Sequence, residues 1–159
     1  MKQRLRIIIA LTILVVILGV VLGVETWRRQ QATVLEPGAI PVYVNGRLAG
    51  QFREKDRERL EMVSFVDDEE GKTQEGWMLR DALLLIFDRD ELRPETQVIV
   101  SSSSQDKSAS LTWAEIASPE AMVMFDLSGR GTLKLVSRLE RLDTRNEWVQ
   151  DVDKIEVTP

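Results

Sequence analysis

The chain has 159 residues, of which 43% are hydrophobic and 30% are charged, and its 26 acidic against 21 basic side chains give a net charge of −5. It contains no cysteine and no histidine, which excludes disulfides, thiol nucleophiles, iron–sulfur clusters, imidazole-ligated haem or zinc, and every catalytic triad with an imidazole base. The negative charge argues against a protein whose main role is to bind nucleic acid.

The first 24 residues differ from the rest of the chain. Residues 1–6 carry three basic side chains and no acid, and Ile7 to Val24 form an uncharged run of 18 residues. As a helix this run spans roughly 27 Å, close to the thickness of a bilayer core. The alternative is a cleaved secretory signal, but the apolar part of such a signal is about 7–15 residues long and ends at a small-x-small site. We therefore favour an uncleaved transmembrane anchor.

The orientation of this anchor follows from the basic residues on either side of it. Three bases precede the run, whereas Arg28 and Arg29 follow it beside Glu25, and Trp27 suits an interfacial position. The bias favours a cytoplasmic N-terminus in the cell membrane and an extracytoplasmic domain. The expected organisation is a basic N-terminus at 1–6, a single-pass anchor at 7–24, a linker at 25–41 and one domain at 42–159.

The first expected element of the domain is a β-hairpin. Asn45-Gly46 lies between Val42–Val44 and Arg47–Phe52, and both residues tolerate the positive φ angles of a tight hairpin turn. Arg53–Arg59 is densely charged, and we favour a solvated loop there over a helical turn. Leu60–Val66 is predicted to be a strand.

The next elements are an acidic turn and the main helix. Asp67–Gly71 contains four consecutive carboxylates, but their spacing lacks the alternating ligands of a calcium loop, so a solvated loop is favoured. Within Gly76–Phe87, apolar residues recur at the spacing of a buried helical face: Leu79, Ala82, Leu83 and Ile86. This pattern predicts one convincing helix, which Pro94 prevents from continuing.

The remaining elements are short strands. The expected elements are strands at Thr96–Val100 and Ser108–Trp113 around the polar segment Ser101–Ser110, a helical turn at Trp113–Ala117, strands at Ala121–Leu127 and Thr132–Ser137, and a closing strand at Trp148–Val157 with a bend at Asp151. Together they predict an α+β domain with a mixed or antiparallel sheet and one main helix.

The second half of the chain resembles the molybdopterin-binding domain of the sulfite-oxidase family. The resemblance rests on Gly76 followed by Leu79, Arg80, Asp81, Leu83 and Leu84; on the elements at Val98–Ser104, Leu111–Ile116 and Gly131–Val136; and on the ending Trp148, Val149, Val152, Ile155 and Val157. It covers residues 76–157, about half of the chain, and implies a sulfite-oxidase-like mixed β domain.

The departures from that family bear on function. Its catalytic members bind molybdenum through a cysteine, which this chain lacks, and their cysteine-bearing first half is missing as well. The chain is similar to short, exported, cysteine-less relatives. The predicted anchor, the acidic domain and the missing catalytic side chains together indicate a membrane-anchored, non-catalytic binding or interaction module with a protein partner in the cell envelope. The alternative is a redox accessory protein that binds a pterin or molybdenum cofactor, with molybdopterin implied by the resemblance alone.

A hydrolase of envelope polymers is a third, less favoured hypothesis. It would need a carboxylate pair, and the candidates are Asp88, Asp90 and Glu91 after the main helix, and Asp151 with Asp153. Such a pair must face a cleft at a defined separation, which the sequence does not indicate.

The other candidate sites have structural interpretations that we favour. Ser101–Ser104 with Lys107 could supply a nucleophile and a base, but the polar, serine-rich context indicates a loop. Trp77, Trp113 and Trp148 could form a ligand platform, but core packing is the commoner role. The sequence thus assigns no catalytic residue and no metal ligand, and it leaves cofactor-binding residues open.

Overall fold

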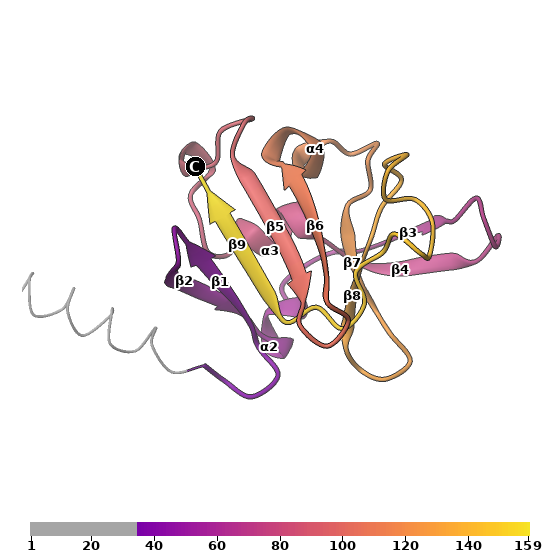
Figure 1. Ribbon diagram of the computed structural model, residues 1–159, viewed down its shortest axis with the longest axis horizontal. Coiled ribbons are helices and arrows are strands. Elements are labelled where there is room, and N and C mark those ends of the chain that lie inside the picture. Colours follow the sequence, from indigo (N-terminus) through magenta and orange to yellow (C-terminus); the bar gives the residue numbers. More distant parts are fainter. Residues whose placement is uncertain (1–34) are drawn as a thin grey trace, which may run out of the picture. The chain divides into compact units, whose positions relative to one another are not determined.

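Two β-sheets joined by short helices make up residues 35–159, the part of the chain that the computed structural model describes (Figure 1). The first sheet has the order β2-β1-β9-β5-β6, with β1 (Ile40–Val44), β2 (Arg47–Phe52), β5 (Gln97–Ser102), β6 (Lys107–Thr112) and β9 (Lys154–Thr158). It is mixed, because β1 and β9 run parallel while the other pairs are antiparallel.

The second sheet is antiparallel, with the order β3-β4-β7-β8. Its strands are β3 (Met62–Val66), β4 (Thr73–Met78), β7 (Met124–Leu127) and β8 (Leu133–Val136). The helical elements are α2 (Glu54–Arg57), α3 (Leu79–Leu83), the 3₁₀ turn η1 (Arg89–Glu91) and α4 (Trp113–Ala117). The expected mixed β domain is confirmed in part: the architecture is mostly β, with two sheets and short helices.

Alternation of apolar and polar side chains places the core on one face of the first sheet. In β5, Val98 and Val100 are fully buried, and in β9, Ile155 and Val157 are buried between more exposed neighbours. The second sheet joins the same core through Phe125, whose ring stacks on that of Phe52 with centroids 6.0 Å apart. Period-two burial is what the short apolar patterns in the sequence predict.

Two predicted turns are confirmed by their backbone angles. Asn45 and Gly46 have φ angles of 49° and 76°, so this dipeptide forms the turn of the β1–β2 hairpin. Asp151 has a φ angle of 53° at the expected bend. The closing segment is not one strand, however: Val149 forms a bridge with Leu135 of the second sheet before the bend, and β9 joins the first sheet after it.

The predicted helix over Gly76–Phe87 is wrong in extent. The chain continues as β4 to Met78, and α3 covers only Leu79–Leu83. The strand persists because Gly76 to Met78 pair with β7, and the backbone N–H of Leu79 donates to the carbonyl of Val123 at 3.0 Å. Tertiary pairing thus overrides the helical periodicity, although Leu79, Ala82 and Leu83 are buried as that periodicity predicts. In the described part of the chain, residues 35–159, no element is the single main helix that the sequence indicated.

The favoured loop at Arg53–Arg59 is also corrected, because α2 forms a helical turn there. Asp56 stabilises its start: one carboxylate oxygen accepts from the backbone N–H of Arg53 at 3.0 Å and from its Nε at 2.8 Å. This pairing with Arg53 holds the pKa of Asp56 below its usual value.

The predicted anchor Ile7–Val24 and Trp27 lie outside the described residues, as does most of the predicted linker. Strand β1 begins at Ile40, two residues before the predicted domain start. Within residues 35–159, no helix has the length and apolar character needed to cross a membrane.

Candidate functional site

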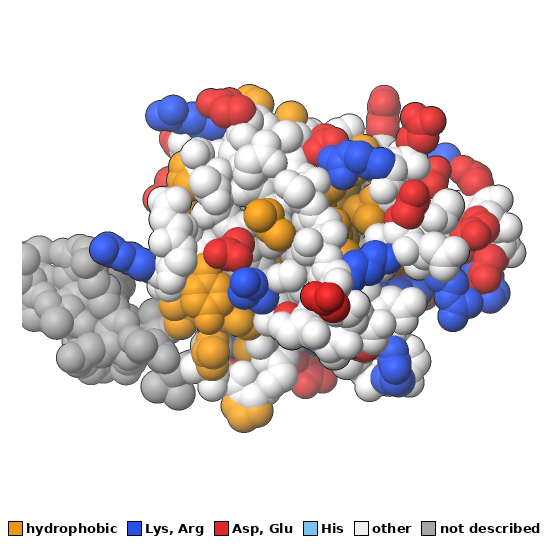
Figure 2. Space-filling view, viewed as in Figure 1, with side chains coloured by type: hydrophobic (Ala, Val, Ile, Leu, Met, Phe, Trp, Pro, Cys, Tyr) orange, Lys and Arg blue, Asp and Glu red, His pale blue; other side chains and the backbone are white. Residues whose placement is uncertain are grey.

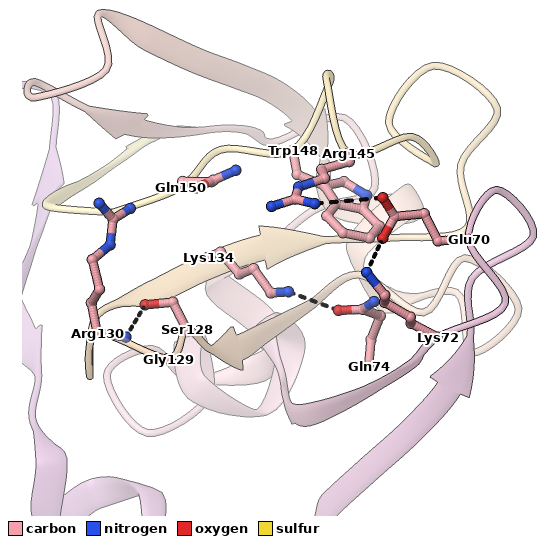
Figure 3. A pocket seen from close by; sticks show the side chains of 10 residues that line it. All are labelled: Glu70, Lys72, Gln74, Ser128, Gly129, Arg130, Lys134, Arg145, Trp148 and Gln150. Carbon is pink, nitrogen blue, oxygen red and sulfur yellow. Dashed lines mark hydrogen bonds and ion pairs between the residues drawn. The ribbon is translucent and has the colours of Figure 1, made fainter.

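A cavity of about 370 Å³ opens beside the second sheet, and basic side chains dominate its lining. Its lining comes from four segments that are separate in sequence: Glu70, Lys72 and Gln74; Ser128, Gly129 and Arg130; Lys134; and Arg145, Trp148 and Gln150. Figure 3 shows these side chains converging, with Glu70 and Lys72 at one end, Arg130 and Ser128 at the other, and Lys134 between them. We call this cavity the basic pocket.

The turn between β3 and β4 brings Glu70 and Lys72 to the pocket. Its organiser is Asp67, a buried carboxylate that accepts hydrogen bonds from the backbone N–H of Glu70 at 2.6 Å and from the Gln74 amide at 2.8 Å. These bonds, the Glu70 N–H above all, hold the pKa of Asp67 below its usual value. Gly71 completes the turn with a φ angle of 66°, a conformation that glycine adopts without strain.

We expect Asp67→Asn to destabilise the domain at neutral pH and to flatten its acid unfolding. The folded-state pKa of Asp67 is depressed, so its stabilising contribution is complete above the unfolded-state pKa of about 3.9 and is lost as the pH falls below it. Denaturant unfolding of the full chain in detergent across an acid pH series would measure this. Asp68→Asn is the matched control and should lose stability with falling pH as the wild type does. The hypothesis fails if Asp67→Asn shows the same loss with falling pH as the wild type and the control.

Lys134 lies at the floor of the pocket and pairs with Asp126 on the neighbouring strand, which does not line the pocket. The Lys134 ammonium lies 2.9 Å from Asp126 Oδ2, donates to Gln74 Oε1 at 2.8 Å, and stands 5.1 Å from the centroid of the Trp148 ring. The side chains of Lys134 and Asp126 are only 20% and 12% exposed. Limited solvent access strengthens the Lys134–Asp126 attraction, so the ammonium faces the pocket as one member of an ion pair.

The other cations are held at the rim. Lys72 Nζ lies 2.6 Å and Arg145 Nη1 lies 3.4 Å from the carboxylate of Glu70. At the opposite end, Arg130 contacts Asp151 at 3.1 Å. The Lys72–Glu70 interaction, with Arg145 nearby, keeps the pKa of Glu70 below its usual value. Figure 2 shows this mixture of acidic and basic side chains on the side of the molecule where β3 and β4 lie.

Trp148 and Gln150 add polar side-chain groups to the lining of the pocket. The Nε1 atom of Trp148 is buried and has no hydrogen-bond partner among the described residues. Buried donors of this kind are normally hydrogen-bonded, so an unpaired donor beside a cavity indicates a possible contact for a ligand in that cavity. The predicted core role of the tryptophans is consistent with the burial of Trp113 and Trp148, whereas Trp77 is half-buried under the guanidinium of Arg57.

Three of the five carboxylates proposed from sequence, Glu91, Asp151 and Asp153, accept hydrogen bonds within the local structure. Glu91 accepts from the backbone N–H of Asp88 in the capping box of η1. Asp151 accepts from Thr132 and Gln105 as well as Arg130. Asp153 accepts from the backbone N–H of Ser103, and Asp90 is exposed.

The serine segment is also structural. Ser102 and Ser104 hydrogen-bond to each other, and the Lys107 ammonium donates to the carbonyl of Asn146. Lys107 therefore ties the β5–β6 hairpin to the loop that carries Arg145 and Trp148. Across residues 35–159, no three metal-ligating side chains gather in one place.

Sequence reasoning did not find the basic pocket. Its cations come from a turn, a strand and two loops, and no spacing along the chain links them. One signal was available: Lys134 interrupts an apolar strand, Leu133–Val136, and a charge at a half-buried strand position calls for a partner or a function.

Comparisons with known proteins give no family assignment. The sequence matches no protein-family model, and no curated protein is significantly similar to it.

Proposed function

We propose that this chain is a membrane-anchored, non-catalytic binding module that presents its β domain outside the cytoplasm and binds a small anionic ligand in the basic pocket. The observation that carries this proposal is the convergence of four cations, Lys72, Arg130, Lys134 and Arg145, on one cavity in a chain where acids outnumber bases. Glu70 is the only carboxylate among the ten lining residues.

The composition of the pocket suits recognition of an oxyanion. Lysine and arginine are the usual partners of carboxylate and phosphate groups, and amide side chains such as Gln74 and Gln150 can fix the orientation of a ligand. A cavity of about 370 Å³ falls within the usual size of small-molecule sites. The anchor at Ile7–Val24 and the charge bias around it support the proposed location.

The proposed domain type is that of the molybdopterin-binding domain of the sulfite-oxidase family, on the strength of the resemblance over residues 76–157. A pterin-binding redox accessory protein is the second candidate, because the pocket offers positive charge to an anionic cofactor. Lys72, Lys134 and Arg145 would hold such a group. The cofactor would supply the redox chemistry, without a cysteine ligand from this chain. A protein partner in the envelope stays part of both proposals.

Membrane attachment and orientation can be tested together. The full chain, expressed in a bacterium, should sediment with membranes and resist carbonate extraction. Protease added to right-side-out vesicles should cleave the domain. A chain released by carbonate, or protected from protease until the vesicles are opened, would contradict the anchor or its orientation respectively.

Ligand binding is tested on the full chain in detergent with inorganic phosphate as the probe. Phosphate, but not chloride at equal ionic strength, should raise the unfolding temperature, because a ligand that binds only the folded state stabilises it. Lys72→Gln combined with Arg145→Gln should remove the effect. Both side chains are more than half exposed, so folding should persist. Equal responses to both salts would overturn the anion site. Pterin released from protein made in a molybdopterin-producing host would favour the second candidate.

A further inference from the structure

The basic pocket already holds a carboxylate at one end. Glu70 lies with one oxygen 2.6 Å from Lys72 Nζ and the other 3.4 Å from Arg145 Nη1, and Figure 3 shows it between these two cations. All three side chains are well exposed, at 36%, 64% and 60%. Burial therefore does not lock this arrangement, and an ion from solution can compete for the same cations.

The backbone beneath Glu70 is fixed independently of its side chain. The Glu70 N–H donates to Asp67, the Gly71 N–H donates to the Asp67 carbonyl, and the Asp67 N–H donates to the Lys72 carbonyl. Within residues 35–159, the Glu70 carboxylate contacts only Lys72 and Arg145. A change of its rotamer can therefore release both cations without unfolding the turn.

Displacement of Glu70 would leave a site with positive charge on several sides. Lys72 comes from the end of the turn, Arg145 from the loop opposite, and Lys134 from the sheet beneath. A planar carboxylate presents its oxygens in one plane, whereas a phosphate group accepts hydrogen bonds in several directions. Donors that approach from different elements therefore suit a phosphate group better.

We propose that Glu70 is an internal competitor that occupies the anion site between Lys72 and Arg145, and that the phosphate group of a small ligand displaces it. This inference rests on the proposed function. It adds the class of ligand and a residue that weakens its binding. Glu70 would set a threshold, so that the pocket fills only when the phosphate compound is abundant.

The simpler alternative is that Glu70 forms ordinary surface ion pairs. Removal of its charge would then affect phosphate only through the general field of the domain, as would removal of any nearby carboxylate. Glu75 is the matched control, because it lies on the same strand as Gln74, one position along, and so points to the opposite face of the sheet. It is exposed and does not line the pocket.

The decisive experiment is calorimetric titration of the full chain in detergent with inorganic phosphate. Glu70→Gln should bind phosphate about three- to fivefold more tightly than the wild type, whereas Glu75→Gln should bind within error of the wild type. Combining Glu70→Gln with Lys72→Gln and Arg145→Gln should abolish the gain, because the cations that Glu70 competes for are then absent.

The possible outcomes distinguish failure of the competitor role of Glu70 from failure of the proposed anion site. Wild-type binding with no gain in Glu70→Gln, or an equal gain in Glu75→Gln, overturns the competitor role and leaves the anion site intact. Absence of phosphate binding in both the wild type and Glu70→Gln overturns the anion site itself. Tight binding that appears only in Glu70→Gln supports both.

Discussion

Gly76→Ala is expected to destabilise the domain by about 3 kcal/mol or more, a large part of the total stability of a small domain. A Cβ atom at this position would lie 1.8 Å from the carbonyl oxygen of Phe125 and 2.9 Å from the Cα of Asp126. Both atoms belong to the backbone of β7, which pairs with β4 at Gly76. Relief of the clash therefore requires the two strands to separate, which also disturbs the buried Phe125.

Two other glycines provide graded controls. Gly129 has open space where a Cβ would go, so Gly129→Ala should change the free energy of unfolding by less than about 0.5 kcal/mol. At Gly50 the nearest atom is Cγ2 of Ile86 at 2.7 Å, a half-buried side chain that can shift, so Gly50→Ala should have an intermediate cost. Denaturant unfolding followed by tryptophan fluorescence gives all three values. Equal stability of the Gly76 and Gly129 variants would contradict the pairing of β4 with β7.

The sequence indicates that Gly76 is a notable residue but does not predict its structural role. The local pattern marks this glycine as a notable residue, but as the start of a helix. Its actual role depends on β7, which follows some fifty residues later in the sequence. The close approach of a second strand depends on tertiary structure, and a single sequence contains no local signal for it.

Features determined by neighbouring residues were predictable. Asn45-Gly46 forms its turn because both residues tolerate positive φ angles, and Asp151 bends for a similar reason. By contrast, the parallel pairing of β1 with β9 joins Val42 to Ile155. The division of the strands into two sheets follows from such long-range pairings, so the sequence suggested the strands but not their partition.

The basic pocket was unpredictable for the same reason. Lys72, Lys134 and Arg145 meet only because β4, β7 and β8 are adjacent and the loop after β8 folds back over them. The acidic turn was interpreted as a solvated loop, which is right for Glu69 but not for Asp67, a buried turn organiser. Nothing in four consecutive carboxylates distinguishes the one that points inward.

Lys134→Met is expected to affect both folding and binding. Removal of the ammonium leaves Asp126 without its cation, and that side chain is only 12% exposed. We expect a loss of about 2 kcal/mol in the free energy of unfolding, less than the roughly 3–5 kcal/mol typical of a fully buried pair, because a fifth of the Lys134 side chain is exposed. Methionine preserves the apolar stem that packs beside Trp148.

A second substitution separates the two effects. Asp126→Asn in the Lys134→Met background removes the uncompensated charge, so it should recover about 1 kcal/mol of the lost stability. The phosphate affinity of the wild type should not return, because the ammonium at the floor of the pocket is still missing. Restored folding without restored binding would assign Lys134 to the ligand site as well as to the ion pair. Phosphate binding equal to that of the wild type in the double variant would confine Lys134 to a structural role and leave recognition to the rim cations Lys72, Arg130 and Arg145.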